Sequence, residues 1–379
     1  MGNVGKRFGC FCVLYAAVGF VTNARATDAV VGPGSCNESG FVSALAVVGG
    51  SSGGTITFNC GAAATITFTS YKPIANAVTI DGGETITFDG ANASPFFQVF
   101  ASANVILKRM TLQHGVFGGG VHAVENFGTL MLDHVRVVNN SSAESPLTNY
   151  GILNVQSSTF SGNVATSATT GNGAAIANQG TSAQVNASTF NANHAFLYGG
   201  AIYSEAPLTL TNSTFTANTG SGGGGAIYQT GSGASTLVYA TIVGNTGPFG
   251  AGLYNDGGAA SSLTVAKSIV SANNAGNCDG VIASDDYNLS NDGGCGGAFS
   301  QPHDLLNQTL PMQALGNNGG PTATMPPQAG NPAINHVPNA QCAIASDQRG
   351  AGRPSGAGCD SGAVEVGGVI DLIFADGFD

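Results

Sequence analysis

A short glycine-containing unit recurs along the central part of the chain. Gly-Gly-Ala-Ile-Tyr occurs at Gly199–Tyr203 and Gly224–Tyr228, Gly-Ala-Gly-Leu-Tyr at Gly250–Tyr254, and a related Gly-Gly-Val-His at Gly119–His122. The aliphatic residue of successive units aligns, in steps of 24 to 31 residues, at Val121, Ile152, Ile176, Ile202, Ile227 and Leu253. Self-similarity at this period predicts a stack of repeats and not a single globular core.

A second motif, Phe-x-x-Asn, runs in parallel with the first. It occurs at 160–163, 190–193 and 215–218, and copies with Val or Ile in place of Phe occur at 137–140, 242–245 and 270–273. Asparagines at the same bend of successive coils can hydrogen-bond to one another, and Asn tolerates the left-handed backbone that bends require. We therefore predict a structural ladder formed by Asn140, Asn163, Asn193, Asn218, Asn245 and Asn273.

Each unit has the pattern of three short strands. Helical repeats are excluded because Gly, Ser, Thr and Asn occur where a helix would need Leu, Ala, Glu or Lys. In one unit we expect strands at Ala201–Tyr203, at Leu208–Thr211 and up to Phe215, with a turn at Ser204–Pro207 and a bend at Asn212. This pattern predicts an all-β fold, a right-handed parallel β-helix with coils about 4.8 Å apart. The inward residues would form columns, and the glycine pair would supply the positive φ of a tight corner.

A solenoid exposes strand edges at both ends and needs caps. Asn37-Glu38-Ser39 followed by Phe41, Leu45 and Val48 predicts an N-terminal capping helix, and the Cys-, Pro- and Gly-rich stretch after Asn274 predicts a C-terminal cap. We divide the chain into a signal peptide (1–26), the N-terminal cap with the opening coils (27–100), the regular coils (101–275), the C-terminal cap (276–366) and a tail (367–379).

The N-terminus has the pattern of a cleavable signal peptide. Lys6 and Arg7 precede an apolar run from Phe8 to Val21, and Ala24-Arg25-Ala26 supplies a small-residue cleavage site. The run is too short to span a membrane, so we expect no membrane span in the mature chain. The net charge of −11 disfavours binding to nucleic acid. These features predict a secreted or cell-surface protein.

Six cysteines remain outside the signal peptide, and we place them outside the regular coils: Cys36, Cys60, Cys278, Cys295, Cys342 and Cys359. An even number in an exported chain predicts disulfides, although six cysteines allow 15 pairings. Proximity in the sequence favours the pairs Cys36–Cys60, Cys278–Cys295 and Cys342–Cys359. A metal site is disfavoured because no Cys-x-x-Cys or adjacent Cys/His pair occurs.

Two sets of motifs resemble known families. Gly-Gly-Ala-Ile together with Phe-x-x-Asn resembles the repeats of chlamydial polymorphic outer-membrane proteins and related bacterial β-helix proteins. Leu-Gly-Asn-Asn-Gly-Gly-Pro-Thr at 315–322, Asn-Pro-Ala-Ile at 331–334, Asp-Gln-Arg-Gly at 347–350 and Cys-Asp-Ser-Gly-Ala at 359–363 resemble the choice-of-anchor Q domain, which caps bacterial surface β-helices. One departure is Asn335, where that family usually has Asp. The last residues, Ile373–Asp379, resemble a short terminal tag of exported gammaproteobacterial proteins. The resemblance implies a surface protein of a Gram-negative bacterium.

Catalytic residues are scarce in the coils. A polysaccharide lyase of this architecture needs clustered carboxylates and a basic residue on adjacent coils. From Gly151 to Ala260 the chain has only two acids, Glu205 and Asp256, and no Lys or Arg. The six histidines are scattered, and His122 falls in the slot of Tyr203, which predicts a wall residue.

The predicted cap contains the remaining candidates. Asp285 and Asp286 are adjacent and are the first candidates for a glycosidase couple or a calcium site, but their position in the cap favours a structural turn. Asp347, Arg349, Arg353 and Asp360 are expected to form an ion-pair and hydrogen-bond cluster that fixes the cap. No catalytic residue, cofactor site or metal site is therefore predicted.

Two functions remain. The favoured one is a non-enzymatic surface protein whose coils display Thr, Ser, Asn and Tyr for adhesion, with glycans or the surface proteins of host or neighbouring cells as partners. The alternative is a carbohydrate-active β-helix enzyme, either a polysaccharide lyase or a glycoside hydrolase. The two are distinguished by whether acids and bases from different coils converge in one groove.

Overall fold

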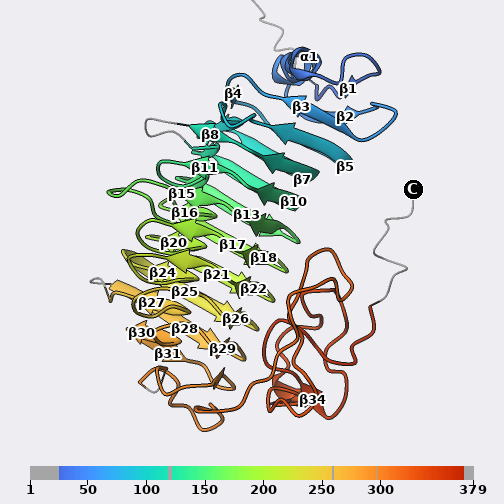
Figure 1. The fold of residues 1–379 in the computed structure, drawn as a ribbon. Helices are drawn as coiled ribbons and strands as arrows, with labels where there is room; N and C mark the ends of the chain where they lie inside the picture. Colours follow the sequence, from blue (N-terminus) through green and yellow to red (C-terminus); the bar gives the residue numbers. More distant parts are fainter. Residues whose placement is uncertain (1–24, 118–121, 258–259, 296, 371–379) are drawn as a thin grey trace, which may run out of the picture.

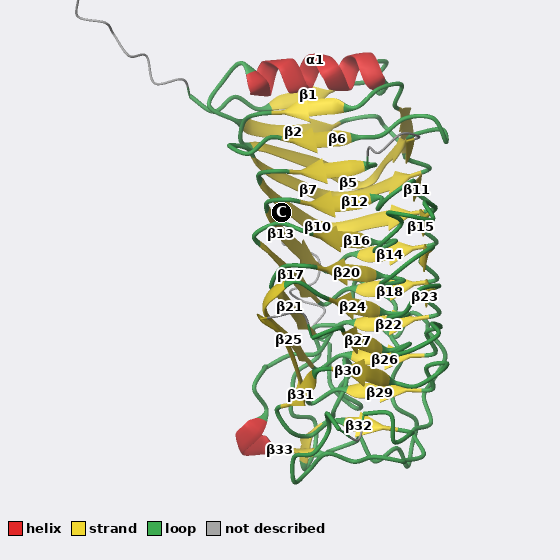
Figure 2. Cartoon of the chain, turned by 90° about the vertical axis from the view of Figure 1, so that its left-hand side faces the viewer, coloured by secondary structure: helices red, strands yellow, loops and turns green. Residues whose placement is uncertain are grey.

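The computed structural model describes residues 25–117, 122–257, 260–295 and 297–370. Most of the predicted signal peptide, the Gly119–Val121 part of the first glycine unit and the Ile373–Asp379 tail lie outside these residues. The chain forms a long stack of strands with one helix across its N-terminal end (Figures 1 and 2). In the ranges that are described, no helix combines the length and the apolar character needed to cross a membrane.

The stack consists of parallel sheets to which successive coils contribute strands. Sheet B has nine strands: β4 (Lys72–Ile74), β6 (Phe97–Val99), β9 (Val124–Asn126), β12 (Leu147–Asn149), β16 (Ile176–Asn178), β20 (Ile202–Ser204), β24 (Ile227–Gln229), β27 (Leu253–Asn255) and β30 (Cys278–Gly280). Sheet C has five: β8 (Val116–Phe117), β11 (Ser141–Ser142), β15 (Val164–Ala165), β19 (His194–Ala195) and β23 (Thr219–Gly220).

Sheet A has 18 strands and bends along its length into two faces. Its first face is formed by β1 (Ala29–Val31), β2 (Gly54–Phe58), β13 (Ile152–Gln156), β17 (Ser182–Asn186), β21 (Leu208–Thr211), β25 (Ser232–Val238), β28 (Ala260–Ala266) and β31 (Ile282–Ser284). Its second face is formed by β3 (Ala64–Thr67), β14 (Thr159–Ser161), β18 (Thr189–Asn191), β22 (Thr214–Thr216), β26 (Thr241–Val243), β29 (Ile269–Ser271) and β32 (Leu289–Ser290). Three long strands span both faces: β5 (Val78–Asp89), β7 (Asn104–Gln113) and β10 (Thr129–Val138).

The all-β, parallel β-helical fold is confirmed. In the coil used above as the example, β20, β21 and β22 match the three expected strands within about two residues, as is usual for strand ends. Sheet C was not predicted, because strands of two residues are too short to show an alternating pattern.

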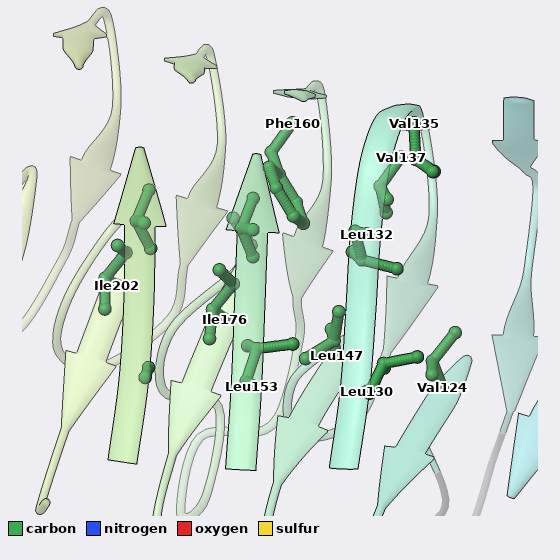
Figure 3. Packing of buried hydrophobic residues seen from close by; sticks show 14 of the residues in the cluster. Val124, Leu130, Leu132, Val135, Val137, Leu147, Leu153, Phe160, Ile176 and Ile202 are labelled. Atoms are coloured by element: carbon green, nitrogen blue, oxygen red, sulfur yellow. The ribbon is translucent and has the colours of Figure 1, made fainter. Parts of the chain in front are cut away.

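The core is a thin tube filled by columns of aliphatic and aromatic side chains (Figure 3). One column contains the phenylalanines of the Phe-x-x-Asn motif: the Phe160 and Phe190 rings stack at 4.9 Å, and the Phe190 and Phe215 rings at 4.5 Å. All three are fully buried. The copies with Val and Ile belong to the same column, since Val137 pairs with Phe160 and Ile242 with Phe215.

The predicted aliphatic alignment is wrong at its second position, Ile152. The column of Ile176, Ile202, Ile227 and Leu253 continues upward through Leu147 and Val124. Ile152 instead begins β13 and is 38% exposed, and Val121 lies outside the described residues. His122 is likewise not in the slot of Tyr203, which Glu125 occupies through the pairing of β9, β12, β16 and β20. The turns before β9 and β12 differ in length, so glycine motifs alone gave the wrong register.

The corners explain the glycine pair. Gly199 and Gly224 both have φ near +60°, which favours Gly, at +66° and +57°. Gly200 has ordinary φ, but a Cβ there would collide with the carbonyl oxygen of Gly225 in the next coil. The first glycine of the pair therefore provides a left-handed corner, and the second lets adjacent coils approach.

The N-terminal helix caps the tube as predicted. Helix α1 (Glu38–Gly49) begins after Asn37, whose side chain accepts a hydrogen bond from the Gly40 amide. It buries Phe41, Ala44 and Val48 on the first coils, where the Phe41 ring lies 5.1 Å from that of Phe88. Glu38 in its first turn contacts Lys72 of β4 at 2.5 Å, which joins the helix to the coils beneath it.

The three disulfides, Cys36–Cys60, Cys278–Cys295 and Cys342–Cys359, are the pairings that sequence proximity favours. Cys278 does not lie outside the coils, because it is the first residue of β30 in sheet B. Its bond to Cys295 fastens the segment that closes the lower end of the tube, where Phe299 joins the main core.

The chain after about Leu310 does more than cap the end. It returns along the side of the lower coils (Figure 1), with only short elements of its own, namely β33 (Val337–Pro338), β34 (Gly358–Cys359) and a 3-10 turn (Asn339–Gln341). Gln348 hydrogen-bonds to Thr214 and to the Ser188 carbonyl, and Asn212 donates to the Ser346 carbonyl. We name residues 310–370 the return segment. A segment that only capped the end of the stack would not need these contacts along its side.

Candidate functional site

The six predicted asparagines form a ladder inside one corner. Each Nδ2 donates to the Oδ1 of the next asparagine at 2.8–3.0 Å, from Asn140 to Asn273, and the ladder ends on Asn277. Each backbone amide also donates to the next Oδ1, for example Asn193 to Asn218 at 3.1 Å. The left-handed residue is not the asparagine but the one before it, such as Ala192 or Ala217. The ladder is thus buried and structural.

A second ladder was missed. Asn126 donates to Asn149, Asn149 to Asn178, and Asn178 to the Ser204 hydroxyl, at 2.6, 2.9 and 2.9 Å. Its members are the third residues of successive sheet B strands, and all of them are fully buried. The signal in the sequence is Asn-x-Gly at 126–128, 149–151 and 178–180, which a search keyed to Phe-x-x-Asn passes over.

The outer side of the first face of sheet A contains a hollow of about 280 Å³. Its lining comes from β10, β13, β17 and β21: Met131, Asn154, Val155, Gln156, Gln184, Val185, Asn186, Thr209 and Thr211. The polar members form two columns in strict register, with Asn154 beside Gln184 and Gln156 beside Asn186. The Asn186 amide donates to the Gln156 side chain at 2.9 Å. We name this surface the amide groove; no ionisable side chain lines it.

Charged residues lie in register at the N-terminal end of the same face. Asp81, Lys108 and Asp133 occupy matched positions in β5, β7 and β10. Asp81 accepts two hydrogen bonds from Arg109, at 2.9 and 2.6 Å, and lies 3.6 Å from Lys108. Burial alone would raise the pKa of Asp81, but the Arg109 hydrogen bond and the nearby positive charges lower it.

The expectation that acids and bases do not converge concerned residues 151–260, in the middle of the stack. This charged cluster lies outside that range, on three earlier coils. Its signal is a charged residue at matched outward positions of three strands, which becomes visible only when β5, β7 and β10 are aligned. The Arg109 side chain is 47% exposed, so the cluster is open to solvent at one edge.

Asp285 and Asp286 do not form a facing pair of free carboxylates. Asp285 is exposed, whereas Asp286 has left-handed backbone and accepts hydrogen bonds from the His303 ring at 2.7 Å and the His303 amide at 2.9 Å. Burial would raise the pKa of Asp286, but these hydrogen bonds lower it. An ionised carboxylate tied to His303 and Tyr287 fits a turn that holds the lower end in shape.

The predicted charged cluster of the cap lies inside the return segment. Asp347 accepts from Arg349 at 2.8 and 2.9 Å, and Arg353 contacts Glu365 at 3.1 Å with both side chains fully buried. The Arg353 guanidinium also lies 4.2 Å above the Tyr239 ring of the stack. Burial, together with the nearby negative charge of Glu365, raises the pKa of Asp360 to about 6. Glu365 was not predicted, because its pairing depends on a fold in the return segment.

No metal centre is evident within the part of the chain that the structure describes, where no three His, Cys, Asp or Glu side chains are grouped to hold an ion.

The fold and its outer surface define the class: a parallel β-helix protein with one polar, uncharged groove and one charged cluster on the same face. No protein-family model matches the chain, and no curated protein matches it. Among solved structures it is similar to the PL6 family alginate lyase AlyGC, with 11% identity and a TM-score of 0.38 over 80% of this chain. The match spans 56% of that enzyme's length.

Proposed function

We propose that the protein is an exported, cell-surface β-helix protein that binds neutral glycan chains along the amide groove without turning them over. The single observation that supports this function most is the lining of the groove: amide and hydroxyl side chains from three successive coils and Met131 from a fourth, with no acid or base among them. Side chains in one column repeat at the strand spacing of about 4.8 Å, so an extended polymer lying along the axis meets an amide or hydroxyl side chain of each column in three successive coils. Amides both donate and accept, which suits hydroxyl groups.

The lack of charge in the groove favours binding over chemistry. General acid–base catalysis needs a titratable group within hydrogen-bond reach of the reacting bond. Export is supported by the signal-peptide pattern and the three disulfides, which persist in oxidising compartments. The motifs that resemble the choice-of-anchor Q domain fall mostly in the return segment, and we propose surface attachment for this part of the chain.

The test is a glycan array, followed by calorimetry with a neutral polysaccharide that binds the protein on the array. Replacing Gln184 and Asn154 by Ala should weaken binding about tenfold or more, since two hydrogen-bonding groups are removed. Asn191→Ala is the matched control, because Asn191 is an outward amide on β18 of the neighbouring face. Unchanged affinity in the groove variant, or equal loss in the control, would remove the groove from the function.

A second candidate function rests on the charged cluster. Asp81, Lys108, Arg109 and Asp133 bring acids and bases from three coils together, which is the arrangement that a polysaccharide lyase would use. We favour a structural role for it, because Asp81 and Arg109 neutralise each other through two hydrogen bonds. A screen of acidic polysaccharides with and without Ca²⁺ distinguishes the two roles. Release of unsaturated sugars would establish a lyase if Lys108→Ala abolishes it and the variant melts normally.

A further inference from the structure

A small hollow lies on the outer side of sheet B, away from the amide groove of sheet A. Its volume is about 120 Å³, and Tyr71, Phe97, Gln98, His122 and Glu125 line it. Gln98 and Glu125 are paired across β6 and β9, and the Gln98 amide donates to the Glu125 carboxylate at 2.7 Å. Tyr71 is 48% exposed, so an aromatic ring stands at the edge of the hollow.

Within the described ranges, no residue donates a hydrogen bond to the second ring nitrogen of His122, Nε2. Its ring is 98% buried, because only 2% of the residue is exposed. Nδ1 lies 2.9 Å from the Ser145 carbonyl oxygen and 2.7 Å from the Thr148 hydroxyl; because the carbonyl oxygen can only accept, we assign the ring hydrogen to Nδ1. In the neutral ring Nε2 is then an acceptor, and it lies 3.6 Å from the Glu144 carboxylate. Two acceptors therefore face each other beyond hydrogen-bond distance, and none of the residues that the structure describes places a donor between them.

Two carboxylates, those of Glu125 and Glu144, lie at this hollow or beside His122. Burial raises the pKa of Tyr150, and the carboxylates of Glu144 and Glu125 raise it further, which places both within electrostatic reach of that ring. Lys72 follows Tyr71 in the chain, but its ammonium contacts Glu38 and does not line the hollow. Tyr150 stacks on Phe127 at 5.1 Å, and both rings are more than one third exposed.

We propose that this hollow binds the protonated amino group of an amino sugar, such as a glucosamine residue of a deacetylated glycan. An ammonium group has three donors, which match Nε2 of His122 and the carboxylates of Glu144 and Glu125. The exposed face of a tyrosine adds attraction for a cation and an apolar surface for the sugar ring. The flanking aromatic rings favour a sugar carrier over a lysine side chain, which offers no flat face.

The probes are glucosamine oligomers, the same oligomers N-acetylated, and a lysine-containing peptide, titrated calorimetrically into the full mature protein. Glucosamine oligomers should bind, and acetylation, which removes the positive charge, should abolish the binding. Glu125→Gln and Glu144→Gln should each weaken it about tenfold or more. Glu84→Gln, which removes an exposed carboxylate on β5, should leave it unchanged.

Equal affinity for acetylated oligomers, or an equal loss in Glu84→Gln, would overturn the proposal, since binding would then not depend on the ammonium or on this hollow. Tighter binding of the lysine peptide would overturn the amino-sugar assignment. The Gln184→Ala variant of the amide groove should keep full affinity for glucosamine oligomers, so failure of the groove and failure of this hollow are separate results. For His122→Gln, the melting temperature is measured together with the binding. If His122→Gln does not fold, the binding of Glu144→Gln decides the question.

Discussion

Replacing Asn218 by Ala removes one rung from the middle of the buried ladder. The Asn218 side chain donates to Asn245 Oδ1 at 2.9 Å and to the Phe190 carbonyl at 3.0 Å, and its Oδ1 accepts from the Asn193 side chain at 2.8 Å and from the Asn193 amide at 3.1 Å. Asn218 is fully buried, so water cannot take over these bonds.

The magnitude follows from the groups that are left without a partner. The Asn193 backbone amide loses its acceptor, and the Asn193 side chain loses one of two. Each buried group left unsatisfied costs about 1–3 kcal/mol, so Asn218→Ala should lower the free energy of unfolding by about 2–5 kcal/mol. The matched control is Thr209→Ala, whose exposed side chain lies on β21 of the same coil and should change stability by about 0.5 kcal/mol.

The assay is urea unfolding of both variants and the parent, followed by far-ultraviolet circular dichroism at neutral pH. Because repeat proteins can unfold in stages, fluorescence of the tyrosines serves as a second probe, and the two midpoints must agree before free energies are compared. Equal shifts for Asn218→Ala and Thr209→Ala would refute the ladder as a source of stability.

Three further predictions follow. Glu38→Gln should destabilise the N-terminal cap by about 1–3 kcal/mol at pH 7. Burial alone would raise the pKa of Glu38, but hydrogen bonds from Lys72 and Thr69 lower it from 4.5 to about 2. The stability difference from the parent should therefore be complete above about pH 4.5 and vanish as the pH falls toward 2, and a pH-independent difference in melting would contradict this. The mature protein should show no free thiol before reduction, and Cys342→Ser with Cys359→Ser should cost about 3 kcal/mol because the bond closes a 17-residue separation; titratable thiols in periplasmic material would be the contrary result. Arg353→Ala should leave the Glu365 charge buried and unpaired, cost about 3–5 kcal/mol and expose the return segment to limited proteolysis, whereas the exposed Arg136→Ala should not, and equal protease resistance in both would show that the pair does not hold the segment.

The sequence alone determined the solenoid, since a β-helix repeats the same local environment in each coil. The phenylalanine column, the first asparagine ladder and the capping helix each depend on residues close in the chain or one period apart. For that reason Phe190, Asn193 and Asn37 could be assigned their roles from spacing and residue type.

Only the tertiary structure decided the register between coils of unequal length and the contacts of the return segment with the coils. Turns before β9 and β12 change the register, so Val124 and Leu147 replace the residues that the glycine motif suggested. The contacts of Gln348 join residues whose separation fits no period. The charged cluster at Asp81 and the hollow at His122 join residues about one coil apart, but the register that brings them together is set by the strand pairing. A repeat specifies the neighbours along the stack only once the register of the coils is known, and lateral contacts depend on how the whole chain packs, so the candidate sites of this protein are defined only by the tertiary structure.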